Sequence, residues 1–134
     1  MKKTEKTQVE FDYKTIKSFE DACAKCGMDP TALPEVSKLP ADIGKMLIAC
    51  HKLVIIFLAI NNGWKPDWSN WNQYKYFPWF EVLSSGFGFS GSVYLCGHTR
   101  TGVGSRLCTD TSEKALYVAE QFKDLYRDYL LYTE

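Results

Sequence analysis

Five cysteines and His98 are the residues of this chain best suited to metal binding or nucleophilic catalysis. Cys23 and Cys26 have the spacing of a zinc half-site, and Cys96, His98 and Cys108 would supply further soft ligands. A zinc module normally carries two matching half-sites, however, and no second C-x2-C pair follows. Because the first pair also falls on a predicted helix, we expect free, buried cysteines and no metal or other cofactor.

A small enzyme built on cysteine and histidine is a second chemical interpretation. Cys96 and His98 stand two residues apart on a predicted strand and would face the same way, with Cys108 on the neighbouring strand. No third group that would orient the imidazole is obvious, and no carboxylates are spaced as a general acid and base. The Cys/His enzyme is therefore an alternative, and we expect a protein without catalytic residues.

The richest signal is an aromatic segment, residues 64–80. Tryptophan and tyrosine concentrate at interfaces and ligand platforms, although the competing interpretation is that these rings pack over a central helix. Interleaved lysines and arginines would turn the same rings into a stacking surface for single-stranded nucleic acid. The expected binding residues are Trp68, Trp71, Tyr74, Tyr76, Trp79, Arg100 and Arg106.

Charge and composition limit the classes of partner. Sixteen lysines and arginines balance sixteen aspartates and glutamates, so the chain lacks the bulk attraction that draws basic proteins to nucleic acids. The N-terminus carries no apolar signal segment, and the longest apolar run, residues 53–60, is far shorter than the roughly 20 residues that cross a bilayer. An odd number of cysteines without a secretion signal indicates a reducing compartment. We expect a cytoplasmic protein that does not enter a membrane.

The elements that would position these residues form one α+β domain over residues 15–134, after a charged, flexible tail over residues 1–14. Ser18 and Gly27 bound a short N-terminal helix, residues 19–26. Pro40 begins a long central apolar helix of roughly 20 residues, which Asn61-Asn62-Gly63 ends. A three-stranded antiparallel β-meander should follow, with strands in the segments 74–79, 87–96 and 105–109. Asp110, with Glu113 three residues on, predicts the start of a C-terminal amphipathic helix.

The second half of the central helix predicts self-association. Residues 55–60 are apolar on every face, and such a helix must be covered all round. Either the other elements of the chain wrap it or a second subunit does. Because the aromatic segment adds further apolar surface, we expect a homodimer.

Three strings of residues carry a resemblance to other proteins: Gly63-Trp-Lys-Pro-Asp-Trp-Ser-Asn, Tyr74-Lys-Tyr-Phe-Pro-Trp-Phe and Gly104-Ser-Arg-Leu-Cys. Through them, about residues 15–131 resemble a family of short bacterial proteins that is also found in phages and mobile elements. The W-K-P-D-W-S-N and Y-K-Y-F-P-W-F motifs are specific, but the family has no established activity, cofactor or catalytic residue. The resemblance implies a small cytosolic accessory protein.

These observations together predict a non-enzymatic binding module with an aromatic-rich surface. Its partner would be another protein or a second copy of the chain. Single-stranded nucleic acid is the alternative ligand, because rings and cations are interleaved in one segment.

Overall fold

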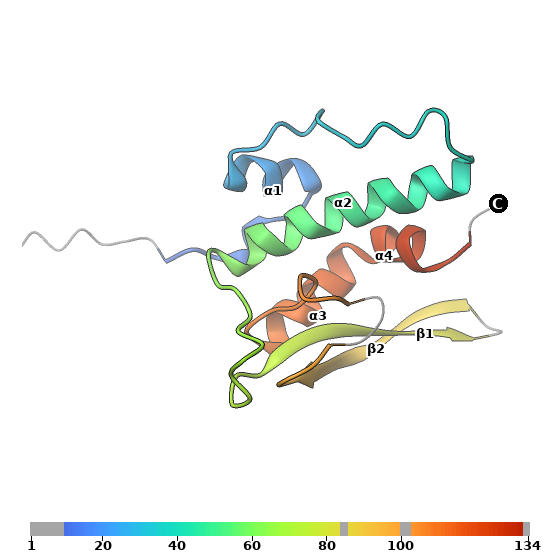
Figure 1. Ribbon diagram of the computed structural model, residues 1–134. Coiled ribbons are helices and arrows are strands. Elements are labelled where there is room, and N and C mark those ends of the chain that lie inside the picture. The colour runs from blue at the N-terminus through green and yellow to red at the C-terminus, as the bar shows by residue number, and fades with distance from the viewer. Residues whose placement is uncertain (1–9, 84–85, 100–102, 133–134) are drawn as a thin grey trace, which may run out of the picture.

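The computed structural model describes residues 10–83, 86–99 and 103–132 and shows an α+β fold. A long central helix, α2, runs through the molecule (Figure 1). The helix α1 and the connection after it lie on one side of α2, while α3, α4 and a β-hairpin lie on the other. Both α1 and α4 contact α2, and α3 packs on the hairpin.

The first helix, α1 (Phe19–Cys26), has the predicted boundaries. The side chain of Ser18 accepts a hydrogen bond from the backbone N–H of Asp21 at 3.1 Å, which satisfies one of the unpaired groups of the first turn. Gly27 ends the helix with φ of 68°, a left-handed conformation that glycine adopts without strain. Phe11 and Tyr13 also pack against the core, so packed structure begins inside the segment predicted to be a tail. Tyr13 begins a short 3-10 helix, Tyr13–Thr15, which precedes α1.

The central helix, α2 (Ala41–Asn61), confirms the predicted length and ends at Asn62 in a left-handed conformation. Within the stretch 55–60 only Leu58 is exposed, while the other five residues are buried by elements of the same chain. Of the two alternatives, the structure therefore shows that other elements of the chain wrap this stretch, and the homodimer stays a prediction. The length and composition of α2 would also allow it to cross a membrane, a criterion that core helices of soluble proteins meet as well.

The sheet consists of an antiparallel hairpin, β1 (Lys75–Leu83) and β2 (Gly86–Leu95), with a bulge between Trp79 and Phe80. The third strand expected near residues 105–109 is reduced to one antiparallel bridge, between Thr109 and Tyr76. The bridge pairs Thr109 with β1, whereas the third strand of a meander would pair with β2. The N–H and C=O groups of Thr109 and Tyr76 exchange hydrogen bonds of 2.7 and 2.9 Å, which fixes the end of the preceding loop against β1.

The predicted C-terminal helix is two helices, α3 (Ser112–Gln121) and α4 (Lys123–Leu130). They are separated at Phe122, whose backbone leaves the helical region with φ of −118° and ψ of 29°. The change of direction keeps Phe122 buried and brings Tyr126 to 4.7 Å from the ring of Phe80 on the hairpin. The residue that caps α3 is Thr111 rather than Asp110, because the Thr111 hydroxyl accepts from the N–H of Lys114.

Candidate functional site

The loop between α2 and β1 is held in shape by its own polar side chains. The Asp67 carboxylate accepts hydrogen bonds from the backbone N–H and the hydroxyl of Ser69, at 3.0 and 2.6 Å. Bonds from the Ser69 side chain and then from its backbone lower the pKa of Asp67. The backbone N–H of Asp67 in turn donates to the side-chain oxygen of Gln73 at 2.6 Å. These bonds fix the backbone on either side of Trp68 before any ligand arrives.

Lys75, at the start of β1, holds this loop in place through its side chain. Its side chain is fully buried, with 0% of its surface exposed. The ammonium group donates to the backbone oxygens of Asn70, at 2.9 Å, and of Cys96, and it lies 5.1 Å from the centre of the Trp68 ring. A lysine interleaved with aromatic residues was expected to be a surface cation. Lys75 is instead buried, and its hydrogen bonds connect the loop to the residue that follows β2.

The loop and the chain before Thr109 enclose a cavity at the C-terminal end of α2, with a volume of about 340 Å³. We call it the tryptophan cavity. Its volume lies within the range of small-molecule sites. It is lined by Val54, Leu58, Asn61, Trp64, Lys65, Pro66, Trp68, Ser105 and Arg106.

Two residues that line the cavity each carry a buried polar atom without a hydrogen-bond partner. In the described part of the chain, only three buried side-chain polar atoms lack a partner, and two of them are Asn61 Oδ1 and Trp68 Nε1. The Asn61 amide cannot simply be turned over, because its Nδ2 donates to the backbone oxygen of Cys108 at 2.8 Å. Unpaired buried groups of this kind cost about 1–3 kcal/mol each, and native proteins rarely retain them away from functional sites.

Two cations stand at the edge of the tryptophan cavity. Lys65 and Arg106 are both exposed, and neither forms an ion pair within residues 10–83, 86–99 and 103–132. No acidic residue is among the nine that line the cavity. This end of the molecule therefore presents unpaired positive charge next to aromatic rings. Arg100, also predicted as a binding residue, lies outside the described residues.

The other predicted binding residues are not part of the cavity. Tyr74 and Tyr76 form a ring cluster with Tyr94 of β2, in which the centres of Tyr74 and Tyr94 are 4.8 Å apart. Trp71 is 68% exposed, and its ring lies so close over Gly97 that an added Cβ would come within 2.4 Å of it. Trp79 is partly exposed on β1. Of the seven residues predicted from the sequence, the structure brings Trp68 and Arg106 together at one site.

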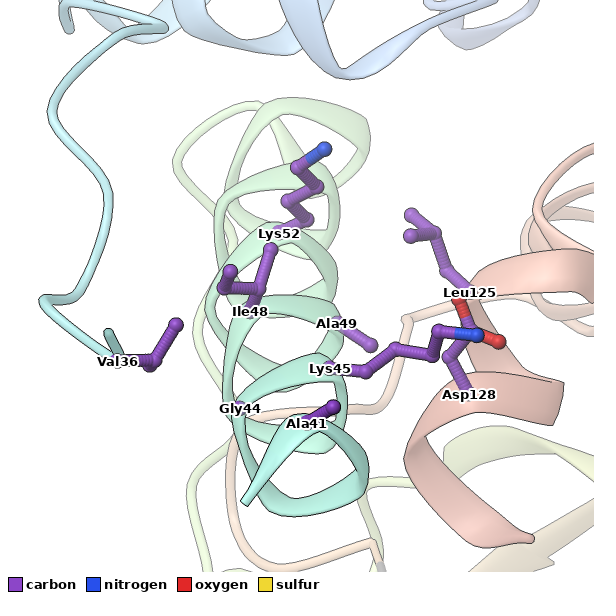
Figure 2. A pocket seen from close by; sticks show the side chains of 9 residues that line it. All are labelled: Val36, Ala41, Gly44, Lys45, Ile48, Ala49, Lys52, Leu125 and Asp128. Atoms are coloured by element: carbon purple, nitrogen blue, oxygen red, sulfur yellow. The ribbon is translucent and has the colours of Figure 1, made fainter. Parts of the chain in front are cut away.

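A second hollow, of about 350 Å³, lies between α2 and α4 (Figure 2). Its lining contains no aromatic residue and none of the unpartnered buried atoms found in the described chain. Figure 2 shows Lys45 extending from α2 toward Asp128 and Leu125 of α4. Lys45 and Lys52 bring two positive charges to this lining and Asp128 brings one negative charge, so the hollow differs from the tryptophan cavity by having an acidic residue and no aromatic ring.

The cysteines do not assemble into a metal-binding cluster within the described residues. Within the described residues, no three His, Cys, Asp or Glu side chains lie close enough to hold a metal ion, so the set predicted as a zinc alternative is not brought together. Burial raises the pKa of the Cys108 thiol to about 11, which disfavours the thiolate that a nucleophile requires. Burial also raises the pKa of Cys23 and Cys26 on α1.

Seven of the nine residues that line the tryptophan cavity were not among the predicted binding residues, and three of these matter for the site: Asn61, Trp64 and Lys65. Asn61 was interpreted as part of a helix stop, and Trp64 and Lys65 as members of a general aromatic segment. The sequence did contain one signal for Asn61. It is a polar residue that shares one face of α2 with the apolar residues Val54 and Leu58, at helical spacing.

Comparison of the chain with family models, with curated proteins and with solved structures gave no match. The resemblance carried by the W-K-P-D-W-S-N and Y-K-Y-F-P-W-F motifs therefore stays a prediction.

Proposed function

We propose that this protein is a non-enzymatic binding module and that the tryptophan cavity is its binding site. The observation that carries the proposal is the pair of buried, unpartnered polar atoms, Asn61 Oδ1 and Trp68 Nε1, on two residues that line a cavity of ligand size. A bound molecule that offers a donor to the first and an acceptor to the second would recover hydrogen bonds that the free protein lacks.

The raised pKa of the Cys108 thiol disfavours the nucleophile of the alternative Cys/His enzyme and so supports binding over catalysis. A ligand site formed by a loop on a rigid helix is also a common arrangement, since the helix supplies a fixed wall and the loop supplies specificity. Here α2 contributes Val54, Leu58 and Asn61, and the ordered loop contributes two tryptophans. Cytoplasmic location and a phage or mobile-element context accompany this proposal as predictions.

Single-stranded nucleic acid is the second candidate ligand class, and one observation favours it. The rings of Trp71, Tyr74 and Tyr94 are largely exposed, as stacking on bases requires. The burial of Lys75 removes one of the cations that such a surface would use. Because the cations and the unpartnered atoms gather at the tryptophan cavity instead, the cavity is the better supported site.

The experiment that tests the proposed site fills the cavity and compares it with a matched change elsewhere on the same helix. Leu58 lines the cavity and is 41% exposed, whereas Leu47 is 38% exposed and lines none of it. Leu58→Trp should abolish the binding of ring-containing probes, such as 2-naphthamide and 2-naphthoate, by calorimetry. Leu47→Trp should leave that binding intact.

Thermal unfolding of both variants provides the control, since each introduces the same ring at a comparably exposed helical position. Binding that survives in Leu58→Trp, or is lost equally in both folded variants, contradicts the proposed site. Wild-type protein that binds no ring-containing probe contradicts the proposed function.

A further inference from the structure

The walls of the tryptophan cavity divide into an apolar part and a cationic part. Val54 and Leu58 of α2 face the loop that carries Trp64 and Pro66, and these side chains offer apolar and aromatic surface. Lys65, Ser105 and Arg106 supply the polar part. A volume of about 340 Å³ admits a molecule of one or two rings but no bulky polymer segment.

No acidic residue lines the cavity to balance its positive charge. Lys65 and Arg106 are its only charged lining residues, and neither is paired with a carboxylate in the described chain. Asp67 is the nearest acidic residue in the loop sequence; its Oδ1 accepts two hydrogen bonds from Ser69, and it forms no ion pair with Lys65 or Arg106 in the described chain. A ligand therefore meets positive charge that the fold itself leaves uncompensated.

The Trp68 ring in the wall of the cavity lies next to a fixed, buried cation. The Lys75 ammonium lies 5.1 Å from the centre of the Trp68 ring and is fixed by backbone oxygens of Asn70 and Cys96. A ring held in place in this way loses little conformational freedom when a flat molecule packs against it. Aromatic walls of fixed orientation select flat ligands, because only these make contact over their whole face.

We propose that the tryptophan cavity binds a flat aromatic ring that carries an anionic group. The ring packs against the aromatic and aliphatic wall, and the anion is recognised by Arg106 and Lys65. This inference rests on the proposed function and narrows its ligand class. The shared chemistry is found in two sources, a nucleotide with its phosphate and an aromatic carboxylate. The planar guanidinium of an arginine suits either group, because it can donate two parallel hydrogen bonds.

The test compares ligands that differ only in the anion. For the aromatic carboxylate, the pair is 2-naphthoate and its neutral amide, 2-naphthamide. For the nucleotide, the pair is AMP and adenosine, with inorganic phosphate as an anion without a ring. In calorimetry on the full chain, at least one anionic member should bind about tenfold more tightly than its neutral partner, and inorganic phosphate should bind more weakly than that member.

Variants then locate the charge that makes the difference. Arg106→Gln should remove most of the preference for the anionic ligand while leaving the neutral ligand unaffected. Arg127→Gln provides the matched control, because it removes the same charge from an exposed site on α4, outside the cavity. That variant should retain the preference. Raising the salt concentration should weaken the anionic ligand only.

The ligand pair with the larger preference for its anionic member identifies the natural ligand class. A larger preference for AMP indicates a nucleotide, and a larger preference for 2-naphthoate indicates an aromatic carboxylate. Equal affinity for charged and neutral partners overturns the inference and leaves the proposed function standing, provided that Leu58→Trp blocks both. A preference that survives in Arg106→Gln, or phosphate that binds as tightly as AMP, also overturns it. If no ring-containing probe binds the wild-type protein, the proposed function fails together with the inference.

Discussion

Replacing Lys75 with methionine is expected to lower the free energy of unfolding by about 2–3 kcal/mol. The methionine chain keeps most of the apolar length of the lysine but has no ammonium group. The backbone oxygens of Asn70 and Cys96 then lose a charged donor at once. Removal of the buried charge returns some desolvation energy, but two acceptors lose their partner, so the loss dominates. Chemical denaturation measures the difference.

The matched control for this change is Lys65→Met. Lys65 is an exposed lysine in the same segment and forms no ion pair in the described chain, so its replacement should alter stability by less than about 0.5 kcal/mol. Since Lys75 also holds the loop around Trp68, the Lys75→Met variant should bind ring-containing probes more weakly. Equal stability of the two variants would show that the hydrogen bonds of the buried Lys75 ammonium do not stabilise the fold.

Replacing Phe57 with alanine is expected to lower the free energy of unfolding by about 3–5 kcal/mol. Phe57 is one of the largest fully buried side chains, and it lies in the part of α2 that is enclosed by the other elements of the chain. Its removal leaves a cavity that the surrounding side chains fill only in part. The neighbouring change Leu58→Ala is the control, because that side chain is partly exposed and should cost about 1 kcal/mol or less.

The same pair of variants separates burial within one chain from burial by a second subunit. If other elements of the chain cover this half of α2, the unfolding temperature of the wild-type protein and of Phe57→Ala should not depend on protein concentration. A temperature that rises with concentration would show that association contributes to the stability of the helix. It would support the predicted homodimer.

Elements whose boundaries are set by neighbouring residues could be predicted from the sequence. The helix α1 is an example, since Ser18 caps its start and Gly27 permits the left-handed turn at its end. The central helix α2 is another, because Pro40 and the Asn61-Asn62-Gly63 stretch bound an uninterrupted apolar run. In both helices the decisive interactions lie within a few residues of the boundary, so a local pattern contains them.

Features that depend on contacts between distant residues could not be predicted. The break at Phe122 carries no glycine or proline, and it exists because Tyr126 meets Phe80 across the fold. The bridge between Thr109 and Tyr76 joins two segments that are separated by more than thirty positions, and nothing in the sequence selects β1 over β2 as the neighbour. Helical and strand periodicity report on one element at a time, so they leave such pairings open.

The candidate site could likewise be predicted only in part. The aromatic segment pointed to Trp68, and the search for cations pointed to Arg106, because residue type alone suggests these roles. The part played by Asn61 depends on a hydrogen bond to Cys108, 47 positions further along the chain. Lys75 was misinterpreted for the same reason, because its burial follows from the path of the loop above it and not from its neighbours in sequence.

The most direct test of the tryptophan cavity as the binding site is the nuclear magnetic resonance spectrum of the four tryptophan indole N–H groups. The signal of Trp68 is assigned from its absence in Trp68→Phe, and 2-naphthoate and AMP are then added to the wild-type protein. We expect the Trp68 signal to shift, because its N–H lacks a partner and Trp68 lines the cavity, while the signals of Trp71 and Trp79 stay in place. Shifts at Trp71 or Trp79 with an unmoved Trp68 signal would contradict the account and place binding on the exposed rings.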